Sequence, residues 1–303
     1  MMARTGDLSR RNVLKSGSTV AVLLCLPACT EPAAPLPDFS GIWARNTLEF
    51  EEPASGPGPI MPMTRKPDGT PTMEKVGDYT NPILLPAAAE KLKALGDLAR
   101  TGVVFPDPEN QCLDWPLPNI LRHMQIQFLQ EPDQVTIVYL RSNQVRRVRM
   151  NDSHPAQIVP SSYGDSIGRY EGDTLVVDTV GIKVGTLPMI DWYGTPYSEA
   201  LHVVERYHLI DYEVAKVAIE RHERKSALIP AGETDIEPDL AYRGKGLQIE
   251  ITVEDQGAFT MPWSALITYR RAANAWMEEI CAENLRESVG PERNVPTARV
   301  PDF

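Results

Sequence analysis

A long succession of short alternating runs is the feature that most restricts the fold of this chain. Between residues 123 and 271, apolar and polar residues alternate in short segments that are separated by brief polar links. In LQIEITVE (residues 247–254), for example, every second residue is Leu, Ile or Val. This alternation is typical of β-strands with one buried face. The sequence therefore predicts a mainly β fold.

The links between these runs restrict the connections. Segments such as 131–133 and 142–143 are too short for a crossover, so neighbouring strands are expected to be antiparallel. An antiparallel meander of about ten strands favours closure into a barrel. The expected strands are residues 39–50, 123–130, 134–141, 144–150, 166–171, 174–181, 200–210, 216–223, 247–254 and 265–271.

One helix and two long loops interrupt the pattern. Residues 85–101 predict a helix, because Pro86 suits a first helical turn and leucines recur at helical spacing after it. Residues 151–165 and 183–199 have little periodicity. In a barrel such loops gather at one mouth, where they commonly determine specificity.

The N-terminus predicts export. A twin-arginine pair, Arg10-Arg11, precedes a short apolar run, so residues 1–29 are expected to be a twin-arginine signal and the domain is expected to be periplasmic. Cys29 ends a segment similar to a lipoprotein cleavage box, although Pro27 is unusual there, so tethering to the membrane through Cys29 stays open. We expect a linker at residues 30–38, a single domain at 39–285 and a tail at 286–303.

The net charge restricts the class of ligand, and the remaining cysteines predict a disulfide. The formal net charge of -11 argues against nucleic acid, which favours clustered Lys and Arg. A small molecule is therefore the expected ligand; the oligomeric state does not follow from the sequence. Cys112 and Cys281 are the only cysteines outside the signal, and in an oxidising compartment they are expected to form a disulfide.

Two sets of motifs resemble known families. Trp43 lies in FSGIW, which resembles the Gly-x-Trp signature of lipocalin-like barrels and implies a contact with Arg270 or Arg271. GDSIGRYEGDTLVVDTVGI and four further blocks between Cys112 and Glu283 resemble a family of exported bacterial proteins of unassigned function. Tyr170 departs from the Trp that is usual in its turn motif. This resemblance implies a fold and a compartment but no activity.

Cofactor and metal motifs are missing from the sequence. The chain contains no nucleotide-binding fingerprint, no serine-hydrolase elbow and no His-Glu-x-x-His, so we expect neither a cofactor nor a metal. His202 and His208 share a strand face but lie about 20 Å apart by strand rise, too far for one ion. Any chemistry is therefore expected to be acid–base catalysis by His, Tyr, Asp or Glu.

The candidate binding residues come from strand faces. On residues 200–210 the more apolar face includes Glu205 and Tyr207, which places both inside the barrel. Arg146 also lies among apolar neighbours and would need a carboxylate or an anionic ligand. Arg146 and Glu205 are therefore either a structural ion pair or a substrate clamp. Asp178 joins this set only if its strand face points inward.

The candidate catalytic residues lie mostly in the long loops. His154 and His202 could transfer protons, as could Asp191, Tyr193 and, on its strand, Glu205. Trp192 would stack on a flat ligand or fold back to close the barrel end. Two functions follow from these sets. One is a cofactor-independent lyase or isomerase of a small aromatic or apolar, possibly anionic, compound held in the barrel. The other is an envelope lipoprotein that binds a lipid or small molecule without turnover.

Overall fold

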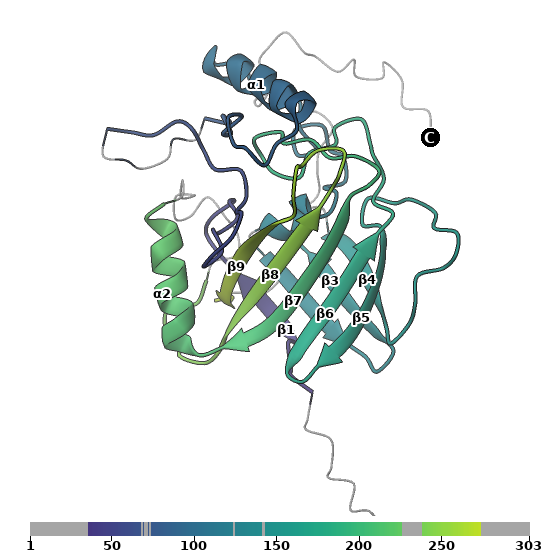
Figure 1. Ribbon diagram of the computed structural model, residues 1–303. Helices are drawn as coiled ribbons and strands as arrows, with labels where there is room; N and C mark the ends of the chain where they lie inside the picture. Colours follow the sequence, from purple (N-terminus) through teal and green to yellow (C-terminus); the bar gives the residue numbers. More distant parts are fainter. Residues whose placement is uncertain are drawn as a thin grey trace, which may run out of the picture. The chain divides into compact units, whose positions relative to one another are not determined.

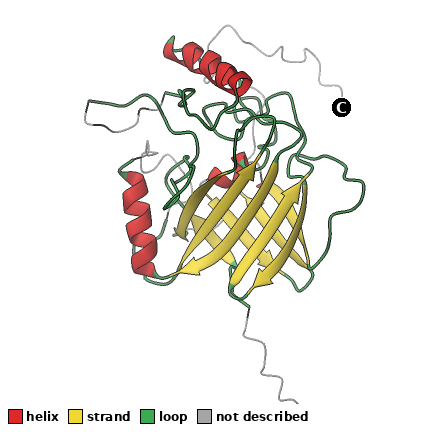
Figure 2. Ribbon diagram, in the orientation of Figure 1, coloured by secondary structure: helices red, strands yellow, loops and turns green. Residues whose placement is uncertain are grey.

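The strands form a closed barrel, as the alternation predicts. The computed structural model describes residues 36–67, 69, 72, 74–123, 125–140, 143–225 and 238–273. Nine strands pair in chain order, and the first pairs with the last to close the barrel (Figures 1 and 2). They are β1 (Gly41–Ala44), β2 (Gln125–Gln130), β3 (Gln134–Tyr139), β4 (Gln144–Met150), β5 (Asp165–Glu171), β6 (Thr174–Val180), β7 (His202–Ile210), β8 (Gly246–Glu254) and β9 (Trp263–Arg271).

The barrel interior is the hydrophobic core. Along β8 the predicted face, Leu247, Ile249, Ile251 and Val253, has no exposed surface. These side chains belong to one continuous cluster of buried residues contributed by all parts of the barrel wall. Every second residue of β8 is buried because successive strand side chains point to opposite faces of the sheet.

One pair of neighbouring strands is parallel, which corrects the expected all-antiparallel order. Strand β4 pairs with β5 through Arg149–Ile167 and Met150–Gly168, and these strands run in the same direction. The connection between them, residues 151–164, is long enough to return to the starting end of the sheet, which a parallel pair requires. All other adjacent pairs are antiparallel.

The first helix, α1 (Pro86–Arg100), coincides with the expected one and has Pro86 in its first turn. Its buried face differs from the leucine spacing: Ala88, Leu92 and Gly96 are buried, whereas Leu98 is exposed. At Gly96 a Cβ atom would lie 3.1 Å from a side-chain methyl of Val76, so the missing side chain allows the helix and residue 76 to pack closely. In Figure 1, α1 lies above the upper end of the barrel.

A second helix, α2 (Tyr212–Glu223), replaces the strand expected at residues 216–223. This prediction was wrong because the short run also fits a helix: Ala215, Ala218 and His222 recur at helical spacing and form the buried face. The helix packs beside β8 and β9 (Figure 1), where Ala215 contacts Gly246. The nine observed strands are thus the ten expected ones less this segment.

Trp43 and Arg271 close the barrel at the junction of β1 and β9. The two residues face each other in the strand register, and the guanidinium carbon of Arg271 lies 3.8 Å from the centre of the Trp43 ring. The Trp43 indole also donates to the carbonyl of Phe39 at 2.8 Å. Of the two arginines considered for this contact, Arg271 is the one that lies over the Trp43 ring.

Several predictions concern residues outside the described part of the chain. The export signal with Cys29, most of the linker, Cys281 and the tail at residues 286–303 all belong to this group. The Cys112–Cys281 disulfide therefore stays a prediction. Of the helices that are described, none is both long and apolar enough to cross a bilayer.

Candidate functional site

The predicted pair of Arg146 and Glu205 lies inside the barrel. Arg146 donates from Nη1 to Oε1 of Glu205 at 2.9 Å and from Nη2 to Oε2 at 2.5 Å. Its Nε donates to Ser166 at 3.1 Å, and Nη2 also donates to Thr179 at 2.7 Å. Neither member of the pair is more than 1% exposed. The guanidinium of Arg146, on β4, thus binds side chains from three other strands, β5, β6 and β7.

Tyr207 completes this interior network. Its hydroxyl donates to Oε1 of Glu205, and burial together with the charge of Glu205 raises the pKa of Tyr207 well above its usual value. Every guanidinium nitrogen of Arg146 and both carboxylate oxygens of Glu205 therefore have protein partners. The arrangement fits the structural ion pair better than the substrate clamp, because no donor nitrogen lacks a partner.

The candidate residues of the second long loop are buried. Trp192 is 6% exposed and Tyr193 is 2% exposed, so the ring of Trp192 folds into the core and is not an exposed stacking surface. Asp191 accepts hydrogen bonds from the backbone N–H groups of Tyr193 and Thr195, both at 3.0 Å. The Tyr193 hydroxyl donates to Glu49 at 2.9 Å. These contacts fix the conformation of the loop.

Three other predicted residues meet on the outer wall. Asp178 faces outward from β6, and its Oδ1 atom lies 3.1 Å from Nε2 of His154 and also 3.1 Å from Nε2 of His202. The three side chains are between 23% and 32% exposed. The structure therefore brings together one loop residue and two strand residues that are far apart in the sequence.

Further charged groups surround His154. Its Nδ1 atom lies 2.6 Å from Oδ2 of Asp165, and Asp165 also accepts from Arg149 at 2.6 and 3.2 Å. Burial opposes the charged imidazole, but the hydrogen bonds to Asp165 and Asp178 outweigh it and raise the pKa of His154. The bond from Arg149 lowers the pKa of Asp165. This cluster anchors residues 151–164 to the barrel wall.

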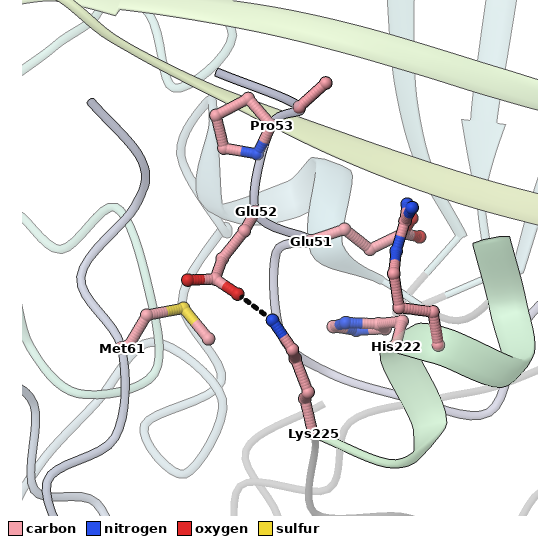
Figure 3. A pocket seen from close by; sticks show the side chains of 8 residues that line it. Glu51, Glu52, Pro53, Met61, His222 and Lys225 are labelled. Carbon is pink, nitrogen blue, oxygen red and sulfur yellow. Dashed lines mark hydrogen bonds and ion pairs between the residues drawn. The ribbon is translucent and has the colours of Figure 1, made fainter. Parts of the chain in front are cut away.

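A pocket lies beside the C-terminal end of α2 (Figure 3). It encloses about 290 Å³ between residues 51–61 and the helix. The Lys225 ammonium donates to the Glu52 carboxylate at 2.5 Å across it. The lining side chains are Glu51, Glu52, Pro53, Ala54, Met61, Arg221, His222 and Lys225.

Two buried ionisable groups form part of the pocket wall. Burial raises the pKa of Glu51, although its carboxylate accepts from the Thr268 N–H at 2.6 Å and from the Thr268 hydroxyl at 2.9 Å. Burial, followed by the charge of Arg45, lowers the pKa of His222 to about 2. At neutral pH His222 is therefore uncharged and Glu51 is easier to protonate than an exposed glutamate.

The sequence pattern did not reveal this pocket. Glu51 belongs to a segment without periodicity, and His222 belongs to the segment interpreted as a strand. The available signal was the spacing of Ala215, Ala218 and His222, which marks the buried face of a helix. The partners Asp165 and Thr179 were also missed, since strand alternation predicts a face but not a contact.

Comparison with known proteins identifies no relative. No protein-family model, no curated protein and no solved structure matches this chain.

Proposed function

We propose that this protein binds a small carboxylate in the pocket beside α2. The position of Arg221 carries the proposal. Arg221 lines the pocket next to Glu51 and His222, and within the described part of the chain it forms no ion pair. Lys225, in contrast, is paired with Glu52. Because a guanidinium binds a carboxylate through two parallel hydrogen bonds, Arg221 is suited to hold an anionic ligand.

The size and lining of the pocket restrict the rest of the ligand. Its volume of about 290 Å³ is close to the lower limit of ordinary ligand pockets, about 300 Å³. Pro53, Ala54 and Met61 offer apolar contacts on the side formed by residues 51–61. A compound with one carboxylate and a small apolar body, such as benzoate, satisfies both features.

Calorimetric titration of benzoate into the purified protein tests the proposal. Saturable binding is expected, and Arg221→Ala is expected to weaken it about 10- to 100-fold, since a hydrogen bond to a charged group contributes about 1.5–3 kcal/mol. Arg224→Ala is the matched control, because Arg224 follows α2 but does not line the pocket. Absence of saturable binding, or an equal loss in both variants, would contradict the proposal.

Acid–base catalysis is a second candidate function for the same pocket. The raised pKa of Glu51 supports it, because a protonated carboxyl can donate a proton to a bound substrate. His222 stays neutral and is hydrogen-bonded to the backbone of Glu49, so Glu51 is the proton donor in this candidate mechanism. The reaction would then be the cofactor-independent lyase or isomerase chemistry expected above. Mass spectrometry of aromatic acids incubated with the protein distinguishes the candidates: binding with no product would exclude catalysis of those acids, and product loss in Glu51→Gln would support it.

The proposed place of action is the periplasmic side of a bacterial membrane. The twin-arginine pair and the following apolar run support this location, and Cys29 would provide a tether if it is lipidated. Fractionation of cells that express the full chain tests both points. Loss of export in Arg10→Lys/Arg11→Lys, and release from the membrane fraction in Cys29→Ser, are the expected results.

A further inference from the structure

We propose that protonation of His154 attaches residues 154–160 to the outer wall of the barrel, so that this loop segment is held more firmly in acid than in alkali. His154 lies in the connection between β4 and β5. Its ring contacts Asp165, the first residue of β5, and Asp178, on β6. One imidazole therefore links the loop segment to two strands of the barrel wall. The group shares no residue with the pocket beside α2.

Both ring nitrogens of His154 face carboxylate oxygens. Nδ1 lies 2.6 Å from Oδ2 of Asp165, and Nε2 lies 3.1 Å from Oδ1 of Asp178. A neutral imidazole carries one N–H, so its other nitrogen would direct a lone pair at an ionised carboxylate. Only the doubly protonated ring donates both hydrogen bonds. Loss of its proton therefore replaces one charge-assisted hydrogen bond by a contact between two acceptors, which weakens the attachment.

The backbone attaches this part of the loop only at its ends. Asn151 donates to the carbonyl of Gly168 at 2.7 Å, and Ser161 donates to the carbonyl of Gly181 at 3.3 Å. Between them, residues 152–160 form no backbone-to-backbone hydrogen bond with any described residue. Their position on the barrel wall therefore depends on side-chain contacts.

Arg149, on β4, holds the start of the loop at every ordinary pH. Its Nε donates to Asp152 at 2.7 Å, and its Nη2 donates to the carbonyl of Ser153 at 3.2 Å. It also donates to Asp165, which fixes that carboxylate beside His154. Because a guanidinium does not lose its proton in proteins, these bonds are insensitive to pH. The response to pH is therefore expected from residue 154 onward.

His202, on β7, contacts Asp178 without needing a second proton. Its Nε2 atom lies 3.1 Å from the same Oδ1 atom that faces His154, and its Nδ1 atom lies 3.9 Å from Glu254, on β8. That second distance is too long for a hydrogen bond, so a neutral ring satisfies the geometry by donating from Nε2. His202 therefore shares a carboxylate with His154 but does not carry the response to pH.

The charge balance around His154 gives the direction of the response. Partial burial opposes the charged ring, but the hydrogen bonds to Asp165 and Asp178 outweigh it and raise the pKa of His154 above its usual value of 6.5. The attached loop segment thus binds the proton more tightly than the detached segment does. The attachment is complete below about pH 6.5 and is lost as the pH rises through the folded-state pKa.

Hydrogen exchange of the full chain, measured by mass spectrometry, tests the attachment. The rates are corrected for the intrinsic effect of pH on amide exchange. The amides of residues 156–159 are then expected to exchange about three- to tenfold faster at pH 9 than at pH 6, because one charge-assisted hydrogen bond at a partly exposed site is lost. The ¹⁵N signals of the His154 ring give a second measurement: at pH 6 both nitrogens are expected to be protonated.

His154→Gln is expected to abolish this pH dependence, because an amide side chain takes up no proton in this range. His202→Gln is the matched control: it changes the other partner of Asp178 but leaves His154 in place, so the pH dependence should persist. Circular dichroism confirms that each variant folds, and the ring signals of the unmodified chain test the proposal even if a variant does not. The proposal is wrong if exchange at residues 156–159 shows no pH dependence, if His154→Gln keeps it, or if the His154 ring is neutral at pH 6.

Discussion

Replacing Arg146 by Met should strongly destabilise the barrel. The substitution removes both hydrogen bonds to Glu205, as well as those to Ser166 and Thr179. Glu205 is then left as a fully buried carboxylate with Tyr207 as its remaining partner. Removing one member of a buried ion pair typically lowers the free energy of unfolding by about 3–5 kcal/mol, and the completeness of this network favours the upper part of that range.

Urea denaturation of a double-mutant cycle measures the effect. Arg146→Met and Glu205→Leu are each expected to lower the free energy of unfolding by several kcal/mol. The double variant should lose much less than the sum, because two apolar residues of similar volume leave no buried charge. The coupling energy then reports the cost of the unpaired partner.

Arg206→Met provides the control on the opposite face of β7. Arg206 pairs with Glu171 at 2.9 Å, but both side chains are 40% exposed. Its replacement should have a much smaller effect, and that effect should decline with added salt. If Arg146→Met were no more destabilising than Arg206→Met, or if the two interior substitutions were additive, the interior network would not stabilise the barrel as argued.

Two further predictions concern pH and backbone conformation. Burial and the charge of Arg45 lower the pKa of His222 in the folded protein to about 2, whereas the unfolded pKa is about 6.5. Below pH 6.5 the unfolded chain therefore takes up a proton at His222 that the folded protein does not, and the free energy of unfolding falls, by about 2 kcal/mol at pH 5. Denaturation at pH 7 and pH 5 should therefore show that His222→Gln removes about this much acid sensitivity, and an unchanged difference would contradict the burial argument. Gly164 and Gly172 both have φ of +64°, but a Cβ atom at Gly164 would lie 2.4 Å from the Val180 carbonyl oxygen, whereas Gly172 faces open space. Thermal denaturation should show that Gly164→Ala destabilises by about 1–3 kcal/mol more than Gly172→Ala, and equal losses would mean that the close approach is relieved at no cost.

The alternation of residue types was enough to predict the barrel and its interior. A strand places successive side chains on opposite faces, so a run such as residues 247–254 shows its buried face directly. The same reasoning placed Glu205 and Arg146 together inside, since a buried arginine and a buried carboxylate each need an opposite charge.

Local pattern was not enough where one segment fits two structures. Residues 216–223 alternate weakly and also carry a helical stripe, and only packing against β8 and β9 makes them part of α2. The parallel pairing of β4 with β5 likewise depends on the path of residues 151–164, which have no periodicity. Both differences arise because short-range preferences are weaker than the tertiary contacts that a segment makes.

The candidate sites, like the fold, could be predicted only in part from the sequence. The sequence by itself determined which residue types the chain offers for chemistry, including His154, Asp178 and His202, and it determined the alternating faces of the strands. Only the tertiary structure decided that these three meet on the outer wall and that Arg221 and His222 line a pocket with residues 51–61. The physical reason is that alternation records whether a side chain is buried, whereas a site depends on which distant segments the closed barrel brings within hydrogen-bond distance.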